Sequence, residues 1–207
     1  MQVTEAITLF KLSVPSSQLS ALVALIAAYI LIRVRFGSRL GGLYGDAAFY
    51  FVLIWKGSYV LTDFGNFLKA PLSLLYYNGG LTGALAGLLA ALFFIWRKGA
   101  AGTPAVLMAA IAVQSVYQIM MALMNRNGPI AETVTIALFG ALLILTVFRA
   151  ASSILWQRQL AALFVAVHFM VAAVQPEGFG GLPFVSTVIF GLSHLIFLSA
   201  GRRLNDQ

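Results

Sequence analysis

Residues 81–98 read LTGALAGLLAALFFIWRK, an apolar run that ends in two basic residues. The run contains no charged residue before Arg97. Its length approaches the ~20 residues that an α-helix needs to cross the ~30 Å hydrocarbon core of a bilayer. We therefore predict a transmembrane helix over residues 81–96, with Arg97 and Lys98 at the membrane surface.

Similar apolar runs occupy most of the rest of the chain. They cover residues 19–34, 43–63, 104–124, 130–148, 159–174 with an extension back toward Ile154, and 183–200. None shows the alternation of a membrane strand, so a helical bundle is the structure that can satisfy the backbone in lipid. The sequence predicts an all-α, polytopic membrane helical bundle of about seven transmembrane helices, forming a single transmembrane domain over residues 1–207.

Composition excludes a water-soluble globule. The 207 residues are 61% hydrophobic and 9% charged, whereas soluble domains carry about 25% charged residues. The chain has no cysteine, which excludes disulfides, thiolate nucleophiles and cysteine-bound metals. No HExxH motif or glycine-rich phosphate loop occurs, so we expect no metal and no cofactor.

Two segments do not fit the pattern of simple spans. Residues 64–80 contain Pro71 and several polar residues, and we predict a broken, re-entrant-like segment there. The first fifteen residues include Glu5 and Lys11 and lack a cleavage pattern, so we expect a short mature segment rather than a removable signal peptide.

The positions of the basic residues predict the orientation. If the spans alternate, nine basic residues share one side: Arg33, Arg35, Arg39, Arg97, Lys98, Arg149, Arg158, Arg202 and Arg203. Lys11, Lys69 and Arg126 fall on the other side. The positive-inside rule then places the C-terminus in the cytoplasm and the N-terminus outside. The net charge of +7 is thereby explained as an insertion signal, and we expect no nucleic-acid partner.

Lys56 lies inside the second span, where a charged side chain costs roughly 2.5–3.5 kcal/mol on insertion scales. Two interpretations carry equal weight. Lys56 binds a phosphate or carboxylate in an internal cavity, or it extends outward to the interface or toward Asp63.

Other polar residues lie at a comparable depth in the predicted outer half. Gln118 belongs to a polar stripe on the fourth span, Glu132 begins the fifth, and His168 lies in the sixth. Interhelical hydrogen bonding, a favourable helix-end position and a neutral buried histidine explain them individually. Together with Lys56 they predict a cavity that opens toward the outer leaflet.

Short segments spread over most of the chain carry a family resemblance. Tyr77-Asn78-Gly79-Gly80-Leu81-Thr82-Gly83 leads into the span that ends at Arg97-Lys98, and Lys56-Gly57-Ser58-Tyr59-Val60-Leu61 and Ala70-Pro71-Leu72 lie upstream. Looser matches follow at residues 130–133, 175–178 and 190–194. In order and spacing these pieces resemble the prolipoprotein diacylglyceryl transferase family.

That family transfers the diacylglyceryl group of phosphatidylglycerol to a lipobox cysteine on the outer face of the bacterial inner membrane. The resemblance implies a multi-pass protein of the bacterial plasma membrane with phosphatidylglycerol as its phospholipid partner. It also implies lipid-binding residues Lys56, Tyr59, Asn78, Gly79 and Gly80, to which the depth argument adds Gln118. The family's essential histidine is replaced here by Asn78, and its signature arginine segment has no counterpart in residues 114–129.

Two functional hypotheses follow, and a third is weaker. In the first, the chain is a transferase in which His168 or Glu132 handles the proton. In the second, it is a catalytically silent member of the same fold that holds a phospholipid, or a membrane or lipoprotein partner. A small transporter is the third, although no inverted repeat is apparent in the sequence.

Overall fold

The computed structural model describes residues 6–9, 12–125, 127–176 and 178–205, and most of them are helical. The α-helices are α1 Ser16–Thr62, α2 Phe64–Lys69, α3 Gly80–Arg97, α4 Pro104–Met124, α5 Pro129–Arg149, α6 Ile154–Ala172 and α7 Leu182–Asn205. Two 3-10 helices, η1 Pro71–Leu75 and η2 Gly178–Gly180, and two short strands, β1 Ala6–Leu9 and β2 Leu12–Pro15, complete the described elements. The predicted all-α membrane bundle is confirmed.

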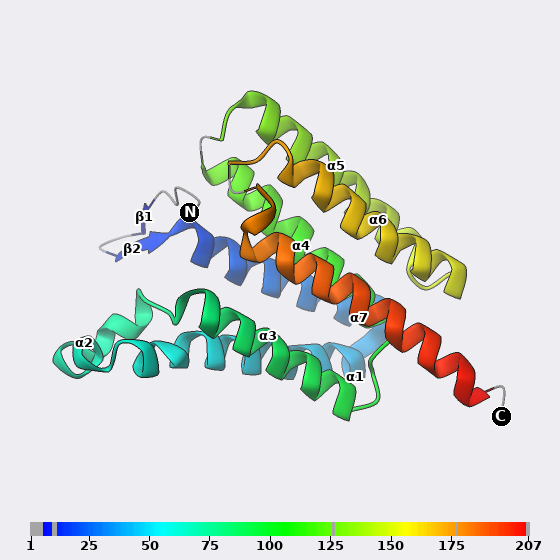
Figure 1. The fold of residues 1–207 in the computed structure, drawn as a ribbon, viewed down its shortest axis with the longest axis horizontal. Helices are drawn as coiled ribbons and strands as arrows, with labels where there is room; N and C mark the ends of the chain where they lie inside the picture. Colours follow the sequence, from blue (N-terminus) through cyan, green and yellow to red (C-terminus); the bar gives the residue numbers. More distant parts are fainter. Residues whose placement is uncertain (1–5, 10–11, 126, 177, 206–207) are drawn as a thin grey trace.

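Six of these helices are long and apolar enough to cross a membrane, and the first of them, at 47 residues, is long enough for two crossings. At 47 residues, a straight α1 would be about 70 Å long at 1.5 Å per residue. Gly37 interrupts it with φ 85° and ψ 177°, and the chain reverses there (Figure 1). The Tyr44 hydroxyl consequently donates to the Leu25 carbonyl at 3.1 Å. In a straight helix these two residues would be about 28 Å apart. The predicted pair of spans on either side of residue 37 is therefore present as a helical hairpin.

Helix α4 is the centre of the bundle. It packs on α1, α5, α6 and α7. More than half of the residues in its apolar 18-residue stretch are buried. Its first residue is Pro104, which is pre-organised for the first turn of a helix. Helices α5, α6 and α7 follow one another in antiparallel contact (Figure 1).

Helix α3 packs closely on the second half of α1 because glycines line its contact face. A Cβ atom on Gly87 would lie 2.8 Å from the Phe51 carbonyl oxygen, and one on Gly83 would overlap the Ser58 side chain. Small residues at such contacts let two helix backbones approach in a membrane, where packing drives association.

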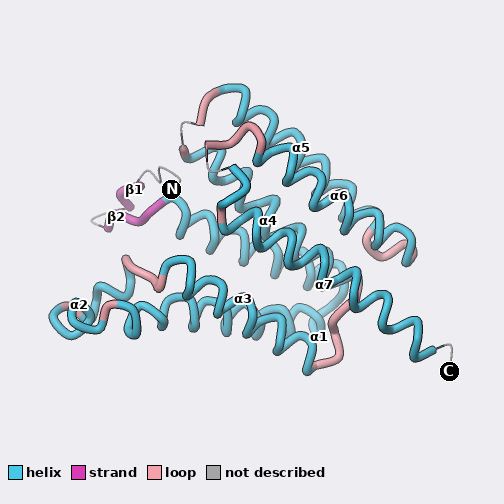
Figure 2. The backbone as a smooth tube through the Cα atoms, viewed as in Figure 1, coloured by secondary structure: helices cyan, strands magenta, loops and turns pink. Residues whose placement is uncertain are grey.

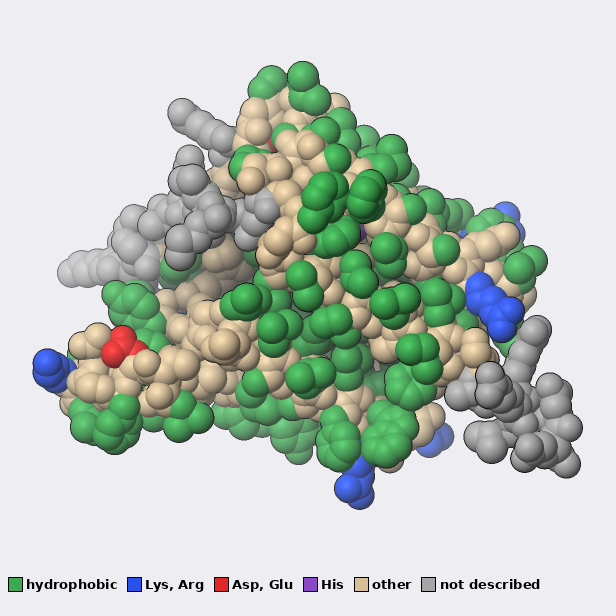
Figure 3. All heavy atoms as spheres, viewed as in Figure 1, with side chains coloured by type: hydrophobic (Ala, Val, Ile, Leu, Met, Phe, Trp, Pro, Cys, Tyr) green, Lys and Arg blue, Asp and Glu red, His purple; other side chains and the backbone are tan. Residues whose placement is uncertain are grey.

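The outer surface of the bundle is apolar over its middle. Ile26, Leu89 and Ile144 are each more than half exposed, as expected for side chains that face lipid. Figure 3 shows hydrophobic side chains over the middle of one face and charged side chains toward its ends. The apolar surface and the lengths of the helices together identify the chain as a multi-pass membrane protein.

The loops gather at the two ends of the bundle (Figure 2). One end carries the turn at Gly37 and the α3–α4 and α5–α6 loops, where Arg39, Lys98 and Arg149 are exposed. The opposite end carries α2 with exposed Lys69. Lys11 and Arg126, two of the three basic residues predicted for that end, lie outside the described residues.

The segment between α1 and α3 is broken, as predicted. Helix α2 has six residues and is separated by Ala70 alone from η1, which begins at Pro71. The sequence did not predict the antiparallel pairing of β1 with β2, in which Ala6 is opposite Pro15. Strand β2 leads directly into α1 at Ser16.

Candidate functional site

Among the described residues, uncharged oxygens from distant parts of the chain accept hydrogen bonds from the Lys56 ammonium. Its Nζ donates to Gln18 Oε1 at 2.7 Å and to the Tyr77 carbonyl at 3.2 Å. Gln18 is buried near the start of α1, and its Nε2 donates to the Tyr76 carbonyl at 2.6 Å. Because the amide oxygen faces the ammonium and the amide nitrogen faces a carbonyl, both ends of the Gln18 side chain are used. Lys56 is thus held toward the segment that precedes α3.

That segment is fixed to α1 through its backbone. The Gly79 amide donates to the Trp55 carbonyl at 3.2 Å, and a Cβ atom on Gly79 would overlap the Ser58 side chain. Only glycine allows this close approach. Asn78 Oδ1 accepts from the Gly80 amide at 2.9 Å, an Asx-type turn at the start of α3.

Aromatic rings surround this site, which we call the Lys56 site: Gln18, Lys56, Tyr59 and residues 76–80. Tyr59 is buried and stacks on Tyr77 with 5.5 Å between ring centroids. Lys56 Nζ lies 5.7 Å from the Trp55 ring centroid, within the range of a cation–π interaction. Tyr77 itself is exposed, so the site reaches the surface of the protein.

The Lys56 site combines two sources of positive potential. One is the ammonium group of Lys56. The other is the N-terminus of α3, an 18-residue helix whose first amides and macrodipole favour an anion. Lys56 bonds the carbonyl of Tyr77, three residues before α3 begins at Gly80. The two features therefore lie side by side, and their chemistry suits a phosphate or carboxylate.

Gln118 and His168 belong to a second polar group, built on different helices. Gln118 Nε2 lies 3.2 Å from His168 Nε2, and His168 Nδ1 lies 2.6 Å from Thr187 Oγ1. Each of these three residues, from α4, α6 and α7, is at most 1% exposed. Phe139 and Phe184 meet the imidazole ring edge-to-face, so apolar surface encloses it.

Gln175, in the loop after α6, completes this second group. Its Nε2 donates to Gln118 Oε1 at 3.0 Å and to Thr135 Oγ1 at 3.2 Å. Because the oxygen of Gln118 is taken by Gln175, its amide nitrogen donates to His168 Nε2. The proton of the neutral imidazole is then on Nδ1 and is donated to Thr187. We call these five residues the His168 network.

Glu132 lies at the edge of the bundle rather than at its centre. It is half-buried in the first turn of α5, three residues before Thr135. A carboxylate at this position interacts favourably with the helix dipole.

Apart from Glu132, the predicted residues thus form two sets. The structure brings Lys56, Tyr59, Asn78, Gly79 and Gly80 together, and it joins Gln118 to His168 in the other set. Asp63, the alternative partner of Lys56, accepts from Asn66 Nδ2 at 2.9 Å.

Sequence reasoning missed several residues that complete the two sets: Gln18, Thr135, Gln175 and Thr187. Gln18 is 38 positions from Lys56, and Gln175 is 57 from Gln118. Gln18 could have been found as a polar residue in the first turn of an apolar span, directly before residue 19. Among the residues that the structure describes, no group of three His, Cys, Asp or Glu is placed to hold a metal ion.

No protein-family model, no curated protein and no solved structure matches this chain. The chain is a multi-pass helical membrane protein with two polar groups, the Lys56 site and the His168 network.

Proposed function

We propose that this protein binds the head group of an anionic phospholipid at the Lys56 site. The observation that carries the proposal is the bond from Lys56 Nζ to the Tyr77 carbonyl at 3.2 Å, which sets a cation beside the N-terminus of α3. A phosphate can accept hydrogen bonds from both an ammonium and helix amides. Exposed Tyr77 and the stacked Tyr59 add aromatic rings of the kind that are enriched at the membrane interface.

The site faces the outer side of the membrane in this proposal. The asymmetry of nine basic residues against three supports a cytoplasmic location for the end that carries Arg39, Lys98 and Arg149. The Lys56 site lies near the start of α1 and the start of α3, at the other end (Figure 1). The resemblance described above favours the bacterial plasma membrane and phosphatidylglycerol as the lipid.

Native mass spectrometry tests this proposal. The protein is purified in mild detergent and titrated in solution with phosphatidylglycerol or with phosphatidylcholine. Each mixture is then released into the gas phase, where the bound lipid is detected by its mass. We expect a bound phosphatidylglycerol, with at least a several-fold loss in the variant Lys56→Gln because the charge is removed. Lys69→Gln is the matched control, since Lys69 is an exposed lysine at the same end of the molecule.

Equal occupancy in Lys56→Gln and Lys69→Gln would refute the proposed site. Equal binding of the anionic and the zwitterionic lipid would refute the role assigned to charge.

Diacylglyceryl transfer is a second candidate function. It is favoured by the contact between the two segments that carry the family resemblance, where Gly79 donates to the Trp55 carbonyl beside Lys56. In this reaction a thiol sulfur bonds to the glyceryl carbon, glycerol phosphate leaves and a base accepts the thiol proton. Asn78 has no basic group at neutral pH, and His168 belongs to the other polar group. Binding without turnover is therefore the function that we favour.

Labelled phosphatidylglycerol and a lipobox peptide separate the two candidates. We expect lipid retention with no label on the peptide above a protein-free blank. Label transfer that is lost in Lys56→Ala would instead establish the transferase and overturn the silent binding role.

A further inference from the structure

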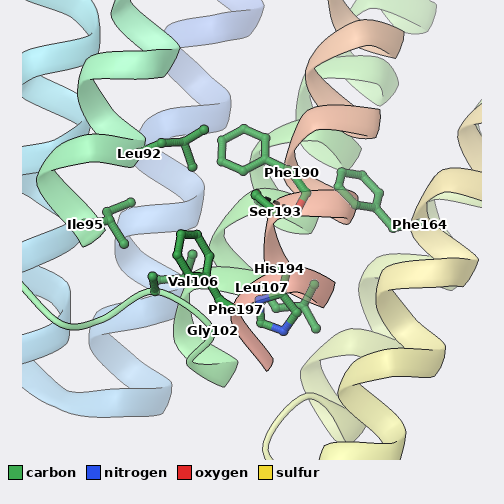
Figure 4. Close-up of a pocket in the computed structure, with 12 residues that line it drawn as sticks. Leu92, Ile95, Gly102, Val106, Leu107, Phe164, Phe190, Ser193, His194 and Phe197 are labelled. Carbon is green, nitrogen blue, oxygen red and sulfur yellow. Dashed lines mark hydrogen bonds between the residues drawn. The ribbon is translucent and has the colours of Figure 1, made fainter. Parts of the chain in front are cut away.

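A small cavity lies at the end of the bundle opposite the Lys56 site. Its walls come from α3, α4, α6 and α7 and include Leu92, Leu107, Phe164, Phe190 and Phe197 (Figure 4). Its volume is about 10 Å³, close to the smallest that admits one water molecule. A lipid chain or an aromatic ligand does not fit in this space.

His194 is the polar residue that this cavity leaves unexplained. It lines the cavity and is 4% exposed. Neither Nδ1 nor Nε2 has a hydrogen-bond partner among the described residues, whereas both ring nitrogens of His168 are engaged. Buried polar atoms in native proteins are nearly always hydrogen-bonded, to protein or to ordered water. His194 therefore requires a partner of the size that the cavity accepts.

Ser193 supplies a second polar atom in the same cavity wall. Its hydroxyl donates to the Phe190 carbonyl at 3.0 Å, so its oxygen retains the capacity to accept. A ligand here must be small and able to form a hydrogen bond to an imidazole nitrogen, and the Ser193 oxygen is a second acceptor in the same wall.

The cavity lies directly beneath the α3–α4 loop. Ala101 and Gly102 of this loop line it, and Gly102 has φ 78°, a conformation that favours glycine. A Cβ atom on Gly102 would lie 3.2 Å from Phe197 Cβ, so the loop is held against α7. Exposed Lys98 is the first residue of this loop. The aqueous phase is thus one loop away, which supplies a ligand without a path through lipid.

We propose that this cavity is a binding site for a single water molecule held by His194. The water bonds to a ring nitrogen of His194, and the Ser193 oxygen is its second partner. The site is independent of the Lys56 site and hydrates the interface of α7 with α3 and α4 near one membrane surface.

Solid-state NMR of the protein in lipid bilayers tests this site directly. The chain has two histidines, so labelling with ring-¹⁵N histidine gives signals from His168 and His194 alone. His194→Phe assigns them by removing one set. We expect magnetisation transfer from water protons to be at least several-fold faster for His194 than for His168, which is enclosed by protein partners.

A cavity-filling variant supplies the matched control. Ala110 lines the cavity, and Ala110→Val should remove the water transfer to His194 while the His168 signals stay unchanged. Ala141→Val, on the exposed face of α5, should leave both unchanged. Water transfer to His194 in the unmodified protein that is no faster than to His168 overturns the proposal, and this comparison does not depend on how the variants fold.

Discussion

His168 shows how single polar residues are accommodated inside this bundle. Its ring receives a hydrogen bond from Gln118 and donates one to Thr187, and Gln118 is in turn bonded by Gln175. Among the described residues, no buried side-chain nitrogen or oxygen of the His168 network lacks a partner. Removing one member therefore leaves others unpaired in apolar surroundings. A buried donor or acceptor that loses its partner costs about 1–3 kcal/mol.

We predict that Gln118→Leu lowers the stability of the protein by about 1–2 kcal/mol. The leucine fills the space but leaves His168 Nε2 and Gln175 Nε2 without the Gln118 amide. Thermal unfolding in detergent measures the change, with Gln159→Leu as control because Gln159 is exposed on α6. An unfolding midpoint equal to that of the control would contradict the network.

Helix α1 shows what an element-level pattern can and cannot predict. The two apolar runs on either side of Arg33, Arg35 and Arg39 predict two crossings, because a charged cluster cannot lie in lipid. The pattern does not show that a single residue, Gly37, reverses the chain within an otherwise continuous helix. Its φ of 85° and ψ of 177° lie in a region that is essentially reserved for glycine.

We predict that Gly37→Ala destabilises the protein by about 1–3 kcal/mol, since alanine must adopt a strained backbone. Gly42→Ala is the matched control: Gly42 lies on the same helix, is exposed and has free space around its Cα. Replacing it should change stability by less than about 1 kcal/mol, in the stabilising direction. Equal losses in both variants would show that Gly37 is not the required turn.

The sequence predicted only part of how the helices bring the residues of the candidate site together. Neighbouring residues such as Asn78, Gly79 and Gly80 are necessarily close, and the resemblance singled them out together with Lys56 and Tyr59. The equal depth of Lys56, Gln118, Glu132 and His168 predicted one shared cavity. The structure instead places Lys56 with Gln18 and Tyr77, and His168 with Gln118 and Thr187. Depth along a helix follows from sequence, but the rotation of each helix and its choice of neighbour depend on tertiary packing.

At the scale of the whole molecule, three polar sites lie at different positions along the length of the bundle. The Lys56 site lies at one end, the His168 network inside, and the His194 cavity beneath the α3–α4 loop at the other end. Exposed Arg39, Lys98 and Arg149 mark that second end. The orientation of the bundle therefore determines which leaflet faces the proposed phospholipid site at Lys56.

The most direct test of an outward-facing Lys56 site uses the absence of cysteine from the chain. Gly65→Cys places a single thiol on α2, beside the Lys56 end, and Ser152→Cys places one in the α5–α6 loop at the opposite end; both positions are exposed. Intact cells that express each variant are treated with a membrane-impermeant maleimide. We predict that Gly65→Cys is labelled in intact cells and that Ser152→Cys is labelled only after lysis. Labelling of Ser152→Cys in intact cells, with Gly65→Cys protected until lysis, would contradict an outward-facing phospholipid site.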